Sequence, residues 1–322
     1  MELFKLFYLR SYTINVVMKN RNIILDCDPG HDDAIAILLA GSTSLFNLLG
    51  ISVVSGNQTV EKTARNAFNV SRYLGINVPI AIGADKPLMR ERLNCGEIHG
   101  ESGLDGFDFP NYKYHYYPKD GADLIIDKCL ENEKVTIVTT GPMTNLAIAL
   151  LRNQKIKEHI EEIVLMGGST DEGNLTKYAE FNILADPDAA AICFRSGIHM
   201  KMIGLNVTRQ VLVMPEIIKR MEKIHNKASN MFVSLMKFFN KTQKEVFNLD
   251  GGPLHDPVTF VSLMSDVIYF EKMDVDINVN PNDIRYAETK CKIDNNSIIE
   301  VATKIDVNRY WDIIEGAIRK YE

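Results

Sequence analysis

The stretch Ile23-Ile24-Leu25-Asp26-Cys27-Asp28-Pro29-Gly30-His31-Asp32-Asp33 decides the fold and the site of this 322-residue chain. Its first three residues are apolar and predict a buried strand. Pro29 and Gly30 end that strand, and the apolar run 34–40 predicts a helix whose first turn holds Asp32 and Asp33. Carboxylates are favoured near a helix N-terminus, but the four in this stretch repel one another. A divalent cation with oxygen ligands, such as Ca²⁺ or Mg²⁺, would relieve that repulsion.

An acidic helix cap followed by a solvated loop is the alternative interpretation of this stretch. It accounts for a single aspartate more readily than for four aspartates around a Pro-Gly turn, because clustered ionisable groups are typical of functional sites.

Apolar strands alternate with helices along most of the chain. The expected strands are 23–25, 48–54, 78–82, 135–139, 162–166 and 200–203, and the expected helices are 34–40, 60–74, 123–130, a segment around 146–150, 187–195 and 306–321. Strands that are apolar throughout indicate a mainly parallel sheet covered by helices on both faces. Residues 207–250 are expected to be largely helical, and the alternating segment 275–305 predicts edge strands.

These features predict an α/β fold, a single large Rossmann-like domain with a mostly parallel central sheet. We expect this domain to span residues 22–322. Residues 1–21 mix charged and apolar residues without the features of a secretory signal, so we expect an N-terminal extension, with Met18 as the expected true start.

Polar residues follow four of the predicted strands. They are Asp28, Asn57, Thr140 and the run Met166-Gly167-Gly168. Ligands of such sheets bind at the carboxyl ends of the strands, so we expect these residues to lie together. The first helix is not preceded by a G-x-G-x-x-G pattern or a P-loop lysine, which argues against dinucleotide and nucleoside triphosphate binding.

Composition excludes several other classes of protein. The net charge is −6 and no block of like charge is long, which argues against nucleic acid or membrane surfaces as partners. No apolar run approaches the ~18 residues of a membrane helix. The five cysteines are scattered without a C-x-x-C pair, which indicates reduced thiols and a cytoplasmic protein.

The run from Asp26 to Asp33 resembles the signature of the inosine-uridine-preferring nucleoside hydrolase family, and the resemblance extends over almost the whole chain from about Asn22. It implies an enzyme that hydrolyses the N-glycosidic bond of ribonucleosides to free base and ribose. In such enzymes an aspartate activates a water bound to Ca²⁺. The resemblance also implies a small-molecule ribonucleoside as substrate and a homodimer or homotetramer as the assembly.

The family's metal ligands match four positions of this chain. The resemblance implies that Asp28, Asp33 and Asp256 bind Ca²⁺ through carboxylates and that Thr140 binds it through its backbone carbonyl. Asp28 also matches the general base. A water beside a cation has a lowered pKa, so ligation and base catalysis are both compatible with this position.

Ribose-binding positions of the family also have counterparts here. The resemblance implies substrate contacts for Asp32, Asn57, Met166, Asn174, Glu180 and Asn182, and none of these is a Lys or Arg. Glu180 and Asn182 are two residues apart, so in an extended chain both would point to the same side. Ordinary Asx turns at strand ends are the alternative for each position alone.

Three further residues are candidates for contacts with the nucleobase. His255 adjoins Asp256, and a histidine so placed can protonate a departing base near neutral pH. Phe239 lies in the region that supplies part of the family's base pocket, although core packing is the usual role of such a residue. His99 lies in the glycine-bearing segment 91–106, which matches a segment that closes over the substrate; a flexible loop is the alternative.

The single tryptophan, Trp311, lies in the predicted last helix. A tryptophan sandwich around the base, known from the purine-specific branch of the family, is therefore not expected. Two other functions fit parts of the sequence. A haloacid-dehalogenase-like phosphatase would share the paired Asp26 and Asp28 but would place Thr or Val where Gly30 stands. A non-catalytic nucleoside-binding protein could use the same scaffold.

Overall fold

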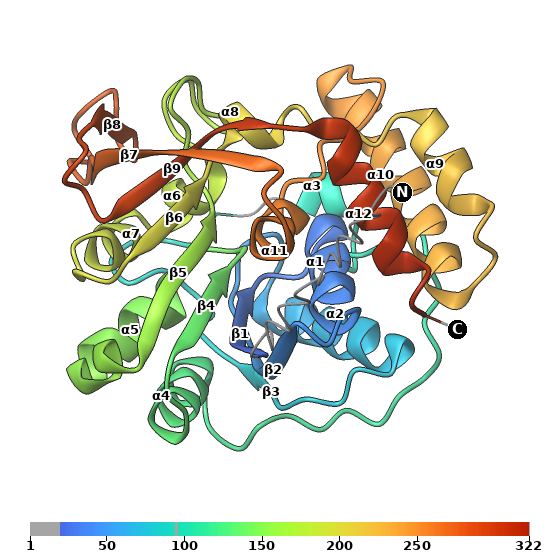
Figure 1. Cartoon of the computed structure of the whole chain (residues 1–322), viewed down its shortest axis with the longest axis horizontal. Helices are drawn as coiled ribbons and strands as arrows, with labels where there is room; N and C mark the ends of the chain where they lie inside the picture. Colours follow the sequence, from blue (N-terminus) through green and yellow to red (C-terminus); the bar gives the residue numbers. More distant parts are fainter. Residues whose placement is uncertain (1–19, 94–95, 322) are drawn as a thin grey trace, which may run out of the picture.

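The computed structural model describes residues 20–93 and 96–321, which form a nine-stranded sheet (Figure 1). In spatial order the strands are β3 (Ile80–Ile82), β2 (Phe46–Val53), β1 (Arg21–Cys27), β4 (Val135–Thr139), β5 (Ile160–Met166), β6 (Met200–Ile203), β9 (Ile299–Ile305), β7 (Ile268–Ile277) and β8 (Thr289–Ile293). The predicted start at Met18 lies outside the described residues, as does the extension apart from residues 20 and 21.

The strands from β3 to β9 run parallel, whereas β7 is antiparallel to β9 and β8 is antiparallel to β7. The predicted α/β fold with a mostly parallel sheet is confirmed. The C-terminal strands lie at one edge, as expected, but β9 is an interior strand between β6 and β7. Its alternating pattern reflects partial exposure of one face rather than a position at the edge.

Helices cover both faces of the sheet, and each layer encloses its own apolar cluster. One layer contains α1 (His31–Gly41), α2 (Val60–Leu74), α9 (Pro215–Glu222), α10 (Lys227–Phe247), α11 (Pro257–Met264) and α12 (Val307–Ile318). The other contains α4 (Gly121–Glu131), α5 (Thr144–Arg152) and α7 (Pro187–Phe194). Figure 1 shows α4 and α5 on the opposite side of the sheet from α1 and α2.

Four short elements complete the chain: α3 (Gly96–His99), the 3-10 helix η1 (Gln154–Glu158), α6 (Phe181–Ala185) and α8 (Leu205–Thr208). The sequence pattern does not predict α3, α6 or α11. Of these, α3 and α6 carry residues of the site described below. Within the described part of the chain, none of the helices combines the length and the apolar character needed to cross a bilayer.

The central strands are held by apolar burial. Ile24, Leu25 and Ile137 have no exposed surface, and each buried aliphatic side chain of this size contributes about 1.5–3 kcal/mol. The sheet therefore forms a rigid base, and the loops at the carboxyl ends of its strands carry the polar residues.

Candidate active site

The N-terminus of α1 places Asp33 at the carboxyl end of β1. Its Oδ2 accepts a hydrogen bond from the backbone N–H of Gly30 at 3.0 Å, and its Oδ1 accepts one from the hydroxyl of Thr140 at 2.7 Å. Thr140 directly follows β4. These bonds fix the carboxylate between two adjacent parallel strands, where the sequence predicted it.

Three buried carboxylates meet at this point. Oxygen atoms of Asp32, Asp33 and Asp256 all lie within 4.8 Å of one another, so the group could bind a metal ion. Asp256 comes from the start of α11, far from α1 in sequence. Burial raises the pKa of Asp33. Burial and then the neighbouring carboxylates raise the pKa of Asp32 to about 7 and that of Asp256 well above its ordinary value. Bringing these groups together is therefore costly without a compensating positive charge.

Asp28 lies beside this group but not within it. Its Oδ2 accepts the backbone N–H of Asn57 at 2.7 Å, while its buried Oδ1 has no hydrogen-bond partner among the described residues. Burial, followed by the charge of Asp33, raises its pKa well above the ordinary value. A Cβ at Gly56 or Gly141 would lie 2.1 or 2.5 Å from the Asp28 oxygens, so glycine is required at both positions. The closest carboxylate triad thus contains Asp32 where the family resemblance implied Asp28.

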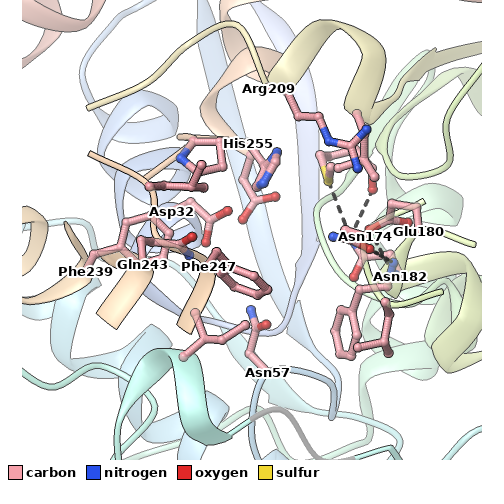
Figure 2. A pocket seen from close by; sticks show the side chains of 18 of the residues that line it. Asp32, Asn57, Asn174, Glu180, Asn182, Arg209, Phe239, Gln243, Phe247 and His255 are labelled. Atoms are coloured by element: carbon pink, nitrogen blue, oxygen red, sulfur yellow. Dashed lines mark hydrogen bonds between the residues drawn. The ribbon is translucent and has the colours of Figure 1, made fainter. Parts of the chain in front are cut away.

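A cavity of about 440 Å³ opens beside the carboxylates (Figure 2). It is lined by Asp32, Asn57, Ile98, His99, Met166, Gly173, Asn174, Leu175, Glu180, Phe181, Asn182, Leu205, Arg209, Leu212, Phe239, Gln243, Phe247, Leu249, Pro253, His255 and Asp256. All the residues predicted to bind substrate are among them. Figure 2 shows Asn174, Glu180 and Asn182 on one wall and Asp32, Phe239 and Gln243 on the opposite wall.

Glu180 reaches the cavity as the N-cap of α6. Its carboxylate accepts backbone N–H groups of Gly168 at 2.9 Å, Asn182 at 2.9 Å and Ile183 at 3.2 Å. Burial raises its pKa to about 7 despite these bonds. The expectation of an extended chain between Glu180 and Asn182 was wrong: the two side chains share a wall because a helix starts between them.

Asn182 connects this wall to the carboxylates. Its amide nitrogen donates to the backbone oxygen of Thr140 at 2.9 Å and to that of Met166 at 3.1 Å. Asn174 is held in turn, because its Oδ1 accepts the backbone N–H of Phe181 at 2.9 Å. The polar side chains of this wall are therefore oriented by the protein before any ligand arrives.

His99 and Phe239 form part of an aromatic wall. Their rings stack with centroids 5.9 Å apart, and both stack on His31. Phe239 is almost fully buried and also lines the cavity, so the core and pocket interpretations both hold for it.

The segment 91–106, predicted to be a lid, contains α3 and a series of turns, while residues 94 and 95 lie outside the described part. Its glycines 100, 103 and 106 have φ of 80°, 81° and 105°, so turn geometry already explains them.

His255 lies at the edge of the cavity next to Asp256. Its Nδ1 is 2.6 Å from the hydroxyl of Thr208. Burial, and after it the charge of Arg209, lowers the pKa of His255 to about 4. The expectation of an imidazole that titrates near neutral pH is therefore not met in this structure, and at neutral pH the ring carries a single proton.

Two polar residues that line the cavity were missed. Arg209 donates to the backbone oxygens of Glu172 at 3.0 Å and Gly173 at 2.5 Å, directly before Asn174. Arg209 thus adds a cation to a lining whose predicted substrate-binding residues include no Lys or Arg. Gln243 faces the cavity from α10. Neither lies in a sequence motif. Only the helical spacing of Gln243 from Phe239, four residues earlier, signalled a shared face.

Comparison with known proteins identifies the family. The model of the inosine-uridine-preferring nucleoside hydrolases matches residues 23–312. The chain belongs to this family. It is therefore a ribonucleoside hydrolase, as predicted. The alternative of a haloacid-dehalogenase-like phosphatase is excluded by this family membership.

Members of the nucleoside hydrolase family resemble the chain over nearly its full length. It is 41% identical over 310 residues to the pyrimidine-specific ribonucleoside hydrolase RihB of Shigella sonnei, covering 94% of this chain and 99% of that protein. The structure of a purine-preferring ribonucleoside hydrolase from Gardnerella vaginalis superimposes with a TM-score of 0.87 at 30% identity, covering 93% and 98%. A plant nucleoside hydrolase superimposes with a TM-score of 0.87 at 25% identity, covering 94% and 99%.

Trp311 of this nucleoside hydrolase lies in α12, as predicted, and does not line the cavity. The phenylalanines that line the cavity are Phe181, Phe239 and Phe247.

Proposed function

We propose that the protein hydrolyses the N-glycosidic bond of ribonucleosides, with pyrimidine nucleosides such as uridine as preferred substrates. One observation carries this proposal: a single cavity joins a buried carboxylate triad, a wall that bears two amides, a histidine and aromatic side chains. The cavity of about 440 Å³ is within the range of small-molecule sites.

The two ends of the cavity suit the two parts of a nucleoside. The ribose would lie with its diol toward Asp32 and Asp256 and its 5′-hydroxyl toward Asn174 and Glu180, because carboxylates and amides accept bonds from hydroxyls. The base would then lie between Phe239 and the remaining apolar lining.

Ca²⁺ is the cation that the donor set fits best. The oxygens of Asp32, Asp33 and Asp256 converge, the hydroxyl of Thr140 donates to Asp33, and the buried Oδ1 of Asp28 has no partner within the described chain. An all-oxygen set with several carboxylates is typical of Ca²⁺. When bound, the cation lowers the pKa of an adjacent water.

Asp28 would accept the proton of the attacking water. Its Oδ2 is held by Asn57 and its Oδ1 is free, so one oxygen orients the carboxylate while the other is available as a base. The transition state of such hydrolysis resembles an oxocarbenium ion. The buried carboxylates stabilise the positive charge that develops on the ribose.

Pyrimidine preference rests on two observations. The relative RihB, which shares 41% of its residues with this chain, is described as pyrimidine-specific. The cavity lining contains no tryptophan to stack on a larger purine, and the amide of Gln243 can pair with the polar edge of a pyrimidine.

The test is a panel of uridine, cytidine, inosine and their 5′-monophosphates, assayed for free ribose or ribose 5-phosphate with Ca²⁺ present and after chelation. We expect release from uridine that depends on the cation and exceeds release from inosine. Binding of uridine by calorimetry without release of ribose would instead establish the non-catalytic alternative.

A further inference from the structure

Thr208 is the last residue of α8, and its side chain contacts His255. Its side chain has no exposed surface, and its Oγ1 lies 2.6 Å from Nδ1 of His255. The two residues come from separate elements, because His255 precedes α11 by two residues. The contact therefore holds the ring through Nδ1 by a residue that does not itself line the cavity.

The position of the hydroxyl proton follows from this contact. A hydroxyl always carries a proton, and a buried O–H without an acceptor is unfavourable. Within the described residues, the only hydrogen-bond partner of Thr208 Oγ1 is His255 Nδ1. The hydroxyl must then donate, and Nδ1 must accept through its lone pair. In a neutral imidazole the ring proton is consequently on Nε2.

Nε2, the other ring nitrogen of His255, is the one that would donate a hydrogen bond to the departing base. His255 is partly exposed and lines the cavity, and because Thr208 occupies Nδ1, Nε2 is the ring nitrogen left to meet a ligand. Figure 2 shows its ring beside Asp32, across the cavity from Asn174 and Glu180. Nε2–H can donate to a departing base, whereas the opposite tautomer would present a lone pair that cannot.

We infer that Thr208 is a positioning residue that holds His255 as the Nε2–H tautomer, so that the departing base meets an N–H donor. This inference rests on the proposed function for its kinetic part. Its structural part, the location of the ring proton, stands independently of the reaction.

Three variants test the inference. Thr208→Val keeps the shape and removes the hydroxyl, and Thr208→Ser keeps the hydroxyl. The control is Thr63→Val, which removes a fully buried hydroxyl that bonds only backbone oxygens of Val54, Thr59 and Val60. It measures what the loss of a core hydroxyl does to the fold alone.

The first readout is the tautomer. In protein labelled with ¹⁵N-histidine, ring nitrogen shifts distinguish protonated from unprotonated nitrogens, and a His255→Asn variant assigns the signals among the seven histidines. We expect Nε2 to be protonated and Nδ1 unprotonated in the wild type and in Thr208→Ser, and a mixture in Thr208→Val. A wild-type signal with the proton on Nδ1 would overturn the inference.

The second readout compares leaving groups. Thr208→Val should lower kcat on uridine by roughly tenfold, the scale of one hydrogen bond to a catalytic group. It should lower kcat on p-nitrophenyl riboside far less, because nitrophenolate leaves without a proton. Thr208→Ser should restore both. Equal losses on both substrates, or a matching loss in Thr63→Val, would contradict the positioning role. If the wild type releases no ribose from any nucleoside, the proposed function fails and the ¹⁵N shifts alone decide the tautomer.

Discussion

The backbone N–H of Asn57 donates to Oδ2 of Asp28 over 2.7 Å, whereas Oδ1 of the same buried carboxylate has no partner among the described residues. Oδ2 is thus oriented by a hydrogen bond, and Oδ1 is available to accept one from a ligand. Asn57 follows β2 and Asp28 follows β1, so two neighbouring strands determine the direction in which this carboxylate faces.

Asp28→Asn should reduce turnover of uridine by roughly 10²-fold or more, the scale of losing a general base. The substitution keeps the shape, but an amide cannot accept the proton. Asp108→Asn, at an exposed carboxylate that does not line the cavity, is the control. Bound metal should be measured in both variants, since near-normal turnover by Asp28→Asn with metal bound would assign the base to another residue.

His255→Ala should cut hydrolysis of inosine and uridine by roughly 10²-fold, because both bases leave poorly without an N–H donor to the negative charge that develops on them. Hydrolysis of p-nitrophenyl riboside should fall far less. The comparison matters because His255 adjoins Asp256. A displaced cation would depress both substrates alike, so equal losses would favour a structural role for the histidine.

The stability of the protein relative to a Glu180→Gln variant should fall as pH rises. Burial raises the pKa of Glu180 to about 7 in the fold, from an ordinary value of 4.5. The folded state therefore retains a proton that the unfolded chain has lost. The stabilisation is fully present below pH 4.5 and is lost as pH rises through about 7, by about 1.4 kcal/mol per pH unit.

Urea unfolding of both proteins at pH 5 and pH 8 measures this difference. Glu172→Gln, at an exposed position of the same loop region, is the control for removing a carboxylate from this part of the surface. A wild-type advantage that grows toward pH 8 would contradict the raised pKa of Glu180.

Removing divalent cations should abolish hydrolysis and lower the Tm. At free Ca²⁺ about a hundredfold above its Kd, binding stabilises a protein by about 2.7 kcal/mol. Asp256→Asn should lose most of this gain because it removes one charge from the triad. An unchanged Tm of the wild type after chelation would count against a cation at the three carboxylates.

Long periodic segments were predictable from the sequence. The limits of α2 and β4 agree with the predictions, because α2 has a clear helical apolar period and β4 is a short, fully buried run. The short helix α6 was not predicted, since its five residues are too few to show a helical period. For this reason the sequence placed Glu180 and Asn182 together at the cavity but predicted an extended backbone where the structure has the start of a helix.

The carboxylates and His255 were predictable because they lie in motifs. Arg209 was not, because its role depends on two backbone oxygens in a loop that only the tertiary structure brings near. The lowered pKa of His255 has the same origin: burial around a side chain cannot be read from its sequence neighbours.

The carboxylate triad draws its members from α1 and from the start of α11, two segments that are distant in the chain and meet only when the helices pack. A cation held there is a reversible cross-link between α1 and the start of α11. A destabilising substitution at Ile37 in α1, which does not line the cavity, should lower the Tm, and bound Ca²⁺ should restore part of the lost stability. Release of the cation and unfolding of the protein would then be coupled.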